Sequence, residues 1–156
     1  MLEKFPPVEK IAEAWSALAS GRVKIDGSPD ALSGTAEVVS SNGEKTYRLA
    51  WDGNVYESDD SATWWQGYPG YPVLALLMAQ GKLPYDPRLG EYFKGINWNA
   101  ANAKAKRNYA EALRSAIDSL NLSPQIVAEV DSEETKTMEA LKSLDIAIRR
   151  YRKKRS

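Results

Sequence analysis

The sequence predicts an α+β fold, in which a small antiparallel β-meander packs on helices and a mainly helical C-terminal half follows. Two dipeptides that favour hairpin turns, Asn42-Gly43 and Asp52-Gly53, separate segments rich in β-branched and aromatic residues. An unbroken apolar run follows at Val73–Ala79, and apolar residues recur at helical spacing further along the chain. With 156 residues and 43% hydrophobic content, the chain is long enough for one packed core.

The N-terminal half should contain one helix and the strands of the meander. Pro6 and Pro7 precede a helix that Gly21 ends, and a short strand is expected at 22–25. The apolar face of this helix comprises Val8, Ile11, Ala12, Trp15, Leu18 and Ala19. After a loop at 27–34, strands are expected at 36–41, 44–51 and 54–58, joined by two-residue turns. In the middle strand Tyr47, Leu49 and Trp51 alternate with more polar residues, which predicts one buried face.

Helices should make up the rest of the chain. Pro72 opens a core helix that Gly81 stops, and Asp86-Pro87 is a typical helix start. Further helices are expected near 97–106, over 106–120 and from Ser123 to Val130.

The last helix is expected over about 134–153. Asp131 and Glu134 form the pattern of a capping box at its start. Its apolar residues form a narrow seam, which is typical of a helix that docks on a groove or on a partner. The seam consists of Met138, Leu141, Leu144, Ile148 and Tyr151.

These elements predict a single α+β domain at 1–122, followed by a helical appendage with a basic tail at 123–156. Formal net charge is zero, but the charges are segregated. Residues 1–80 hold six basic and eleven acidic side chains, whereas 81–156 hold fifteen and ten. This asymmetry favours one basic partner surface.

The composition excludes several kinds of site. Without cysteine or histidine, the chain cannot build a disulfide, an ordinary structural zinc site, or a Ser-His-Asp or Cys-His centre. No other catalytic motif is present, so we expect a protein that is not an enzyme and needs no cofactor. The N-terminus lacks a signal-peptide pattern, and Val73–Ala79 is too short to span a membrane. Together these features predict a cytoplasmic location.

An aromatic loop lies between the meander and the core helix. Four large rings occur where glycines and prolines shape the chain, namely Trp64, Trp65, Tyr68 and Tyr71. They could stack on bases or sugar rings, with Gln66 and Asp60 as polar contacts. Alternatively, they wall the core and leave one or two rings exposed. The nearby acids Glu57, Asp59 and Asp60 lack calcium-loop spacing and are best explained as turn caps or a solvated rim.

Two groups of basic residues are candidates for contacts to nucleic-acid phosphates. The C-terminal run consists of Arg149, Arg150, Tyr151, Arg152, Lys153, Lys154 and Arg155. A second, smaller group consists of Lys104, Lys106 and Arg107. Both groups could equally be solvated helix surface, because basic residues also complement the end of a helix dipole.

The order of several segments resembles that of the SWIM zinc-finger domain over residues 8–83. The matching segments are SGRVKI (20–25), VVSSNGEKTYRLAW (38–51), VYESDD (55–60) and GYPVLALLMAQGKL (70–83). Every zinc ligand is missing. The first pair would fall near Glu57 and Asp59, or Ser58 and Asp60, and the second at Gly70 and Pro72. The resemblance implies a metal-free relative of a DNA- or protein-interaction module.

The leading functional hypothesis is therefore non-catalytic nucleic-acid binding through a basic C-terminal helix and the aromatic loop, with DNA or RNA as partner and no membrane contact. The alternative is a protein–protein adaptor, or an oligomerising subunit, that docks through the seam of its last helix. A third hypothesis is a carbohydrate binder or carboxylate hydrolase that uses Asp59, Asp60 and the tryptophans.

Overall fold

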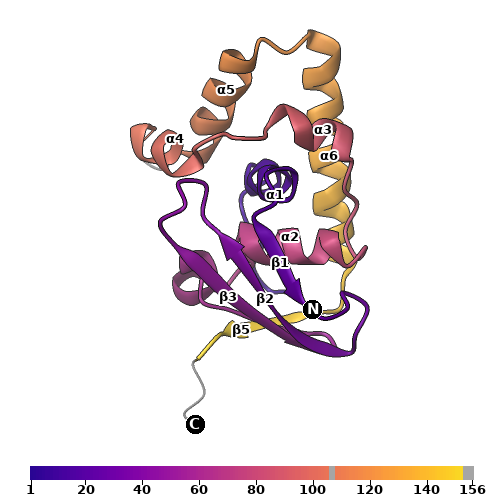
Figure 1. Ribbon diagram of the computed structural model, residues 1–156. Coiled ribbons are helices and arrows are strands. Elements are labelled where there is room, and N and C mark those ends of the chain that lie inside the picture. Colours follow the sequence, from indigo (N-terminus) through magenta and orange to yellow (C-terminus); the bar gives the residue numbers. More distant parts are fainter. Residues whose placement is uncertain (106–107, 153–156) are drawn as a thin grey trace.

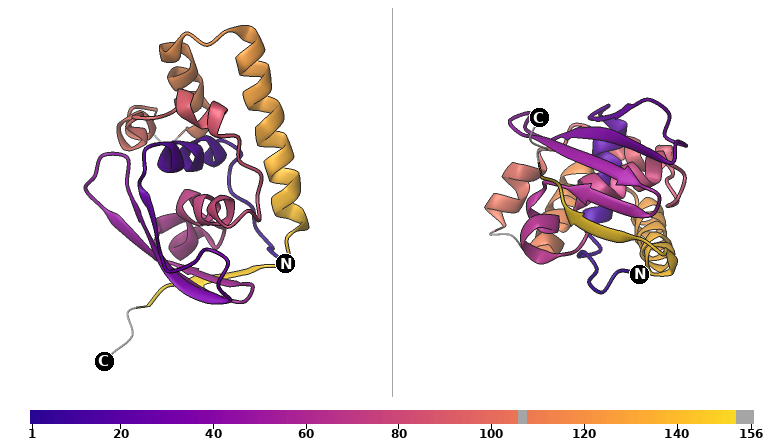
Figure 2. Two further views of the ribbon diagram at one scale, coloured as in Figure 1. Left: turned by 45° about the vertical axis from the view of Figure 1, so that its right-hand side comes forward. Right: turned by 90° about the horizontal axis from the view of Figure 1, so that it is seen from below.

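The computed structural model describes residues 1–105 and 108–152, which form an α+β fold with helices on one face of a sheet (Figure 1). The five strands, in sheet order, are β1 (Val23–Asp26), β2 (Ser33–Val39), β3 (Thr46–Asp52), β4 (Val55–Ser58) and β5 (Ala147–Arg150). The first four pair antiparallel, and β5 pairs parallel with β4. Seen from below, the sheet faces the viewer and the helices lie behind it (Figure 2).

Apart from the unpredicted π-helix η1 and the merging of the last two predicted helices, the helices follow the predicted order. They are α1 (Lys10–Ala19), the π-helix η1 (Ala62–Gln66), α2 (Tyr71–Ala79), α3 (Pro87–Tyr92), α4 (Trp98–Lys104), α5 (Tyr109–Leu120) and α6 (Pro124–Ser143). Of these, α2 is apolar on all sides and lies between the sheet and α1, where residues 72–78 are all buried. Trp15 of α1 is fully buried and its ring lies 5.8 Å from that of Phe93, which connects α1 to α3.

Local side-chain caps set four helix starts, of which those at Asp86 and Ser123 were predicted, whereas the predicted capping box of Asp131 and Glu134 lies inside α6. Asp86, Asn97, Asn108 and Ser123 each accept a hydrogen bond from a backbone N–H in the first turn of the helix that follows. Each cap satisfies an N–H group that has no partner inside the helix. Gly21 ends α1 with a φ of +68°, a conformation that glycine adopts without steric cost.

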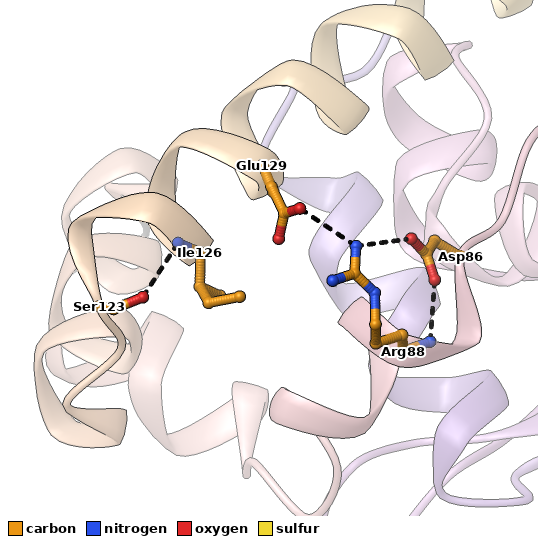
Figure 3. Close-up of polar contacts among 5 residues, drawn as sticks. All are labelled: Asp86, Arg88, Ser123, Ile126 and Glu129. Carbon is orange, nitrogen blue, oxygen red and sulfur yellow. Dashed lines mark hydrogen bonds and ion pairs between the residues drawn. The ribbon is translucent and has the colours of Figure 1, made fainter.

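One exposed arginine joins the start of α3 to α6 (Figure 3). The Arg88 guanidinium donates to Asp86, the N-cap of α3, at 3.4 Å and to Glu129 of α6 at 3.2 Å. Ser123, the N-cap of α6, lies nearby and accepts from the N–H of Ile126. Because the Arg88 side chain is exposed, its ion pairs with Asp86 and Glu129 contribute little to the stability of the fold and act mainly on the position of α6.

The hairpin turns differ from the predicted ones. Between β2 and β3 the predicted two-residue turn at Asn42-Gly43 is wrong, because the chain forms a wider loop. The Ser40 hydroxyl donates to Asn42 Oδ1 and accepts from the N–H of Lys45, and Asn42 Oδ1 also accepts from Glu44 N. These side-chain hydrogen bonds stabilise the wider loop. A two-residue type I′ turn does not depend on such bonds.

Between β3 and β4 a two-residue turn is present, but it is displaced by one residue. Asp52 pairs with Val55, so the central residues are Gly53 and Asn54. Gly53 supplies the positive φ angle, +59°, at the first central position.

The predicted last helix, over about 134–153, is wrong. A single helix, α6, runs from Pro124 through the expected break near Asp131 and ends at Ser143. The chain then runs along the edge of the sheet as β5, whose backbone pairs with β4 (Figure 1). An unpaired strand edge offers a row of backbone donors and acceptors to another strand. The helical pattern of this segment does not indicate that the edge of β4 is available to it.

As a result, the predicted seam is not a continuous helical face. Leu141 is buried, and Met138, Leu144 and Ile148 pack against the core, the last of them from β5. The described part of the predicted appendage, residues 123–152, therefore belongs to the same sheet and core as the N-terminal half.

Candidate functional site

The aromatic loop is held in place by one buried carboxylate. Asp60 is 4% exposed and accepts hydrogen bonds from the hydroxyls of Ser58 and Thr63 and from the N–H of Thr63. Burial raises the pKa of Asp60, and the hydrogen bonds from Ser58 and Thr63 oppose this rise. The carboxylate thereby fixes the start of η1, a π-helix of the kind often found at functional sites.

A tight glycine contact supports the same loop. A Cβ atom on Gly70 would lie 2.0 Å from Asp60 Oδ2, so only glycine allows the loop to approach the carboxylate this closely. Gly70 has ordinary backbone angles and is the N-cap residue of α2. The requirement for glycine is therefore one of space and not of conformation.

The four rings of the aromatic loop are exposed to different degrees. Trp65 is 74% exposed, whereas Trp64, Tyr68 and Tyr71 are half-buried. Tyr71 packs edge-on against Tyr47, with ring centroids 6.1 Å apart. The exposure of Trp65 therefore leaves a broad aromatic surface open to solvent.

The aromatic loop and the C-terminal basic run meet in one place, which we call the Trp–Arg surface (Trp64, Trp65, Arg150 and Arg152). Arg150 Nε donates to the Trp64 carbonyl oxygen at 2.8 Å. The Arg150 guanidinium lies 5.2 Å from the Trp64 ring centroid and 6.0 Å from that of Trp65, and Arg152 lies 5.4 Å from Trp64. Such distances are typical of cation–π contacts. Neither arginine forms an ion pair with a carboxylate among the described residues.

The other basic candidates are spread more widely. Arg149 is exposed on β5 and lies opposite Glu57 in the sheet, and Tyr151 is half-buried beyond the strand. Lys104 is exposed at the end of α4. The remaining candidates lie outside the described residues, namely Lys106, Arg107, Lys153, Lys154 and Arg155.

Beside the Trp–Arg surface lies a cleft of about 500 Å³, between the aromatic loop on one side and α4 and α5 on the other. Trp65 and Gln66 line it from η1, and Asn102 and Tyr109 line it from the opposite wall. A bond from the Ser41 hydroxyl to Asn99 Oδ1, at 2.7 Å, joins the β2–β3 loop to α4 at this cleft. The volume lies in the range of small-molecule sites.

A buried ion pair from α1 lies in the cleft wall. Lys10 Nζ lies 2.8 Å from Glu13 Oε2, and Asn102 Nδ2 donates to Glu13 Oε1. Burial raises the pKa of Glu13, whereas Lys10 and the hydrogen bonds lower it. Lys10 Nζ also lies 3.7 Å from the centroid of the Tyr109 ring. The two charges neutralise each other, so the wall offers polarity without net charge.

A larger hollow, of about 1060 Å³, lies along the outer face of the sheet. Lys24, Glu37 and Arg48 lie opposite one another on neighbouring strands and alternate in sign. With three basic and four acidic side chains in its lining, the hollow has no surplus of positive charge for a polyanion.

The acidic cluster holds turns together. Asp60 binds its own loop, and Asp59 Oδ1 accepts from the N–H of Arg48 at 2.8 Å. Over residues 1–105 and 108–152, no group of acidic side chains is arranged to hold a metal ion. No helix in these ranges has the length and apolar character needed to cross a membrane.

A family model for "Uncharacterised conserved protein UCP014422" matches residues 3–147, nearly the whole chain. The chain belongs to this family. No curated protein and no solved structure gives a significant match. The UCP014422 assignment overturns the SWIM resemblance, which was wrong. A hairpin followed by an apolar helix recurs in many folds, and the matching segments contained none of the ligands that define the SWIM domain.

Sequence reasoning missed the part of the cleft that α1, β3, α4 and α5 supply. The missed residues are Lys10, Glu13, Tyr47, Asn102 and Tyr109. One signal was present, since Lys10 and Glu13 are charged residues in a largely apolar helix, at a spacing that places them side by side. Nothing in the sequence, however, indicates that α4 and α5 lie opposite the aromatic loop.

Proposed function

We propose that this member of the UCP014422 family is a non-catalytic module that binds single-stranded nucleic acid on the Trp–Arg surface. The observation that carries the proposal is the contact between β5 and the aromatic loop. Arg150 binds the Trp64 carbonyl beside the exposed ring of Trp65. Residues from distant parts of the chain thus combine the two groups that single strands require, which are an aromatic platform and fixed cations.

The geometry favours a single strand over a duplex. A base must be unstacked to lie on a protein ring, and bases in a duplex are already stacked on each other. In the part of the chain that the structure describes, no helix protrudes from the Trp–Arg surface with the several free cations needed to enter a major groove. Since base stacking tolerates any sequence, we expect weak preference among bases on this surface.

The adaptor alternative gains no support from the fold. The seam it requires is divided between α6 and β5 and packs against the chain's own core. A concentration-dependent molar mass, measured without nucleic acid, would nevertheless favour it.

Replacing Trp65 with alanine should weaken binding to single-stranded DNA or RNA by about 5- to 100-fold, because stacking contributes about 1–3 kcal/mol per base. Fluorescence anisotropy with labelled single strands and duplexes, at low and near-physiological salt, measures the effect. Trp65→Phe keeps a ring and should restore part of the affinity. Leu32→Ala removes another exposed apolar side chain, 78% exposed, and serves as the control. Equal affinities for the wild type and Trp65→Ala would contradict the proposal.

Replacing Arg150 or Arg152 with alanine should reduce the dependence of affinity on salt. For a single strand, the slope of log K against log salt should become shallower by about 0.7 for each phosphate that the protein no longer neutralises. Arg114→Ala removes a matched exposed arginine from α5 and should leave the slope unchanged. A slope that changes equally in all three variants would show non-specific charge and no defined surface.

A further inference from the structure

The cleft beside the Trp–Arg surface has features of a binding site in its own right. It is lined by three tyrosines whose hydroxyls form no hydrogen bond within the described residues, namely Tyr47, Tyr68 and Tyr109. Phenolic hydroxyls both donate and accept, so three of them around one cavity can satisfy several polar groups of a ligand. The indole Nε1 of Trp98, a buried residue that also lines the cleft, likewise has no partner within the described chain. The tyrosine hydroxyls can bond a polar ligand that enters the cleft, whereas Trp98 Nε1 is buried behind the wall and reports a ligand only indirectly.

The charges of the cleft favour a neutral ligand. Lys10 and Glu13 form a buried pair at 2.8 Å, and the Asp60 carboxylate is already bound to Ser58 and Thr63. Lys45, at the rim, is the one cation lining the cleft that lacks a carboxylate partner among the described residues. A phosphate inside the cleft would therefore have a single unpaired cation, the exposed Lys45, to neutralise it. Flat aromatic rings combined with amides suit an unstacked base instead.

Trp65 connects the cleft to the Trp–Arg surface. Its ring lines the cleft and also lies 6.0 Å from the Arg150 guanidinium. A strand whose phosphates lie near Arg150 and Arg152 therefore passes the mouth of the cleft. Asn102, on the far wall, donates to Glu13 through Nδ2, and its Oδ1 accepts no hydrogen bond from the described residues. That oxygen is available to the amino group of a base.

We infer that the cleft accepts one neutral nucleobase extruded from the bound strand, held between aromatic rings and hydrogen-bonded by tyrosine hydroxyls and Asn102. This inference rests on the proposed function, because the strand delivers the base. Trp65 then belongs to both sites, as the platform at the mouth of the cleft. Unlike stacking on the open surface, hydrogen bonding inside the cleft discriminates between bases.

Titration of the full chain with free nucleosides tests the inference separately from strand binding. Adenosine, cytidine, uridine and guanosine, with methyl glucoside as a neutral sugar, are added while tryptophan indole N–H signals are followed by NMR. The signals of Trp65 and Trp98 should shift in a saturable manner with at least one nucleoside. The Trp51 signal should stay in place, because its Nε1 already donates to the Ala31 carbonyl at 2.8 Å.

Variants that remove one hydroxyl and keep the ring identify the site. Tyr47→Phe and Tyr68→Phe should each weaken nucleoside binding by about 3- to 10-fold, the usual effect of removing one hydrogen bond. Tyr92→Phe removes a hydroxyl from α3, outside the cleft, and should have no effect. Saturable nucleoside shifts that the first two variants weaken would support the inference.

Three results would overturn it. Strand binding without any nucleoside shift at Trp98, and unaffected by Tyr47→Phe and Tyr68→Phe, removes the base pocket and leaves the proposed function standing. Absence of both strand and nucleoside binding overturns both proposals. A shift of Trp98 with methyl glucoside, and none with nucleosides, assigns the cleft to a sugar instead.

Discussion

Replacing Glu134 with glutamine should stabilise the protein at neutral and alkaline pH. Glu134 lies on α6, is 3% exposed, and its Oε2 has no hydrogen-bond partner among the described residues. Burial, the nearby Asp131 on α6 and Glu9 at the start of α1 raise the pKa of Glu134 to about 8. A neutral glutamine of nearly the same shape removes the charge that the fold disfavours.

The effect should depend on pH in a defined direction. Below the ordinary value of 4.5, Glu134 is protonated in both the folded and the unfolded chain, and no stability is lost. As pH rises towards 8, the unfolded chain releases the proton and the folded chain keeps it, so the free energy of unfolding falls. The full loss is at most about 5 kcal/mol and is reached above the folded pKa.

Thermal unfolding of the wild type and Glu134→Gln between pH 5 and 9 measures this difference. The Tm of the variant should exceed that of the wild type by roughly 5–15 °C at pH 9, and the gap should close towards pH 5. Glu139→Gln, a neutralisation on the exposed side of the same helix, controls for the general loss of a negative charge. A gap that is the same at both ends of the pH range would contradict the assignment to Glu134.

Replacing Asp60 with alanine should destabilise the fold by about 3–5 kcal/mol. The substitution leaves the hydroxyls of Ser58 and Thr63 and the Thr63 N–H without their acceptor, and each unpaired buried group costs about 1–3 kcal/mol. Urea denaturation gives the change in the free energy of unfolding. Asp59→Ala, which loses a single bond to Arg48 N at a less buried site, should cost only about 1 kcal/mol.

The close contact between Gly70 and Asp60 predicts that their substitutions are coupled. Gly70→Ala alone should cost about 1–3 kcal/mol, because the new Cβ overlaps the carboxylate. In the Asp60→Ala background that overlap disappears, so the double variant should be more stable than the sum of the single effects by about 1–2 kcal/mol. Strict additivity would show that the two residues do not define the loop together.

The sequence predicted the elements that depend on local chemistry. The strands of the meander and most helices lie close to their expected positions, and Asp86 caps α3 as expected, because such caps act within one turn of the chain. The buried face of β3 followed from the alternation of Leu49 and Trp51 with polar neighbours. The predicted α+β class is confirmed, because it follows from these strands and helices.

Errors arose where long-range partners outweigh local preference. A helical pattern at 144–150 gives way to β5, because the edge of β4 offers backbone hydrogen bonds that no local pattern encodes. Between β2 and β3 a wider loop replaces the predicted two-residue turn at Asn42-Gly43, because hydrogen bonds of the Ser40 and Asn42 side chains stabilise that loop.

The candidate site likewise has features that the sequence predicts and features that depend on long-range packing. The sequence by itself determined that clustered aromatics and basic residues are present, that histidine and cysteine are absent, and that a glycine- and proline-shaped loop carries the rings. Only the tertiary structure brought Arg150 onto Trp64 and placed α4 and α5 across a cleft from Trp65. Contacts between residues some 86 positions apart in the chain depend on how strands and helices pack, and packing is decided by the whole core.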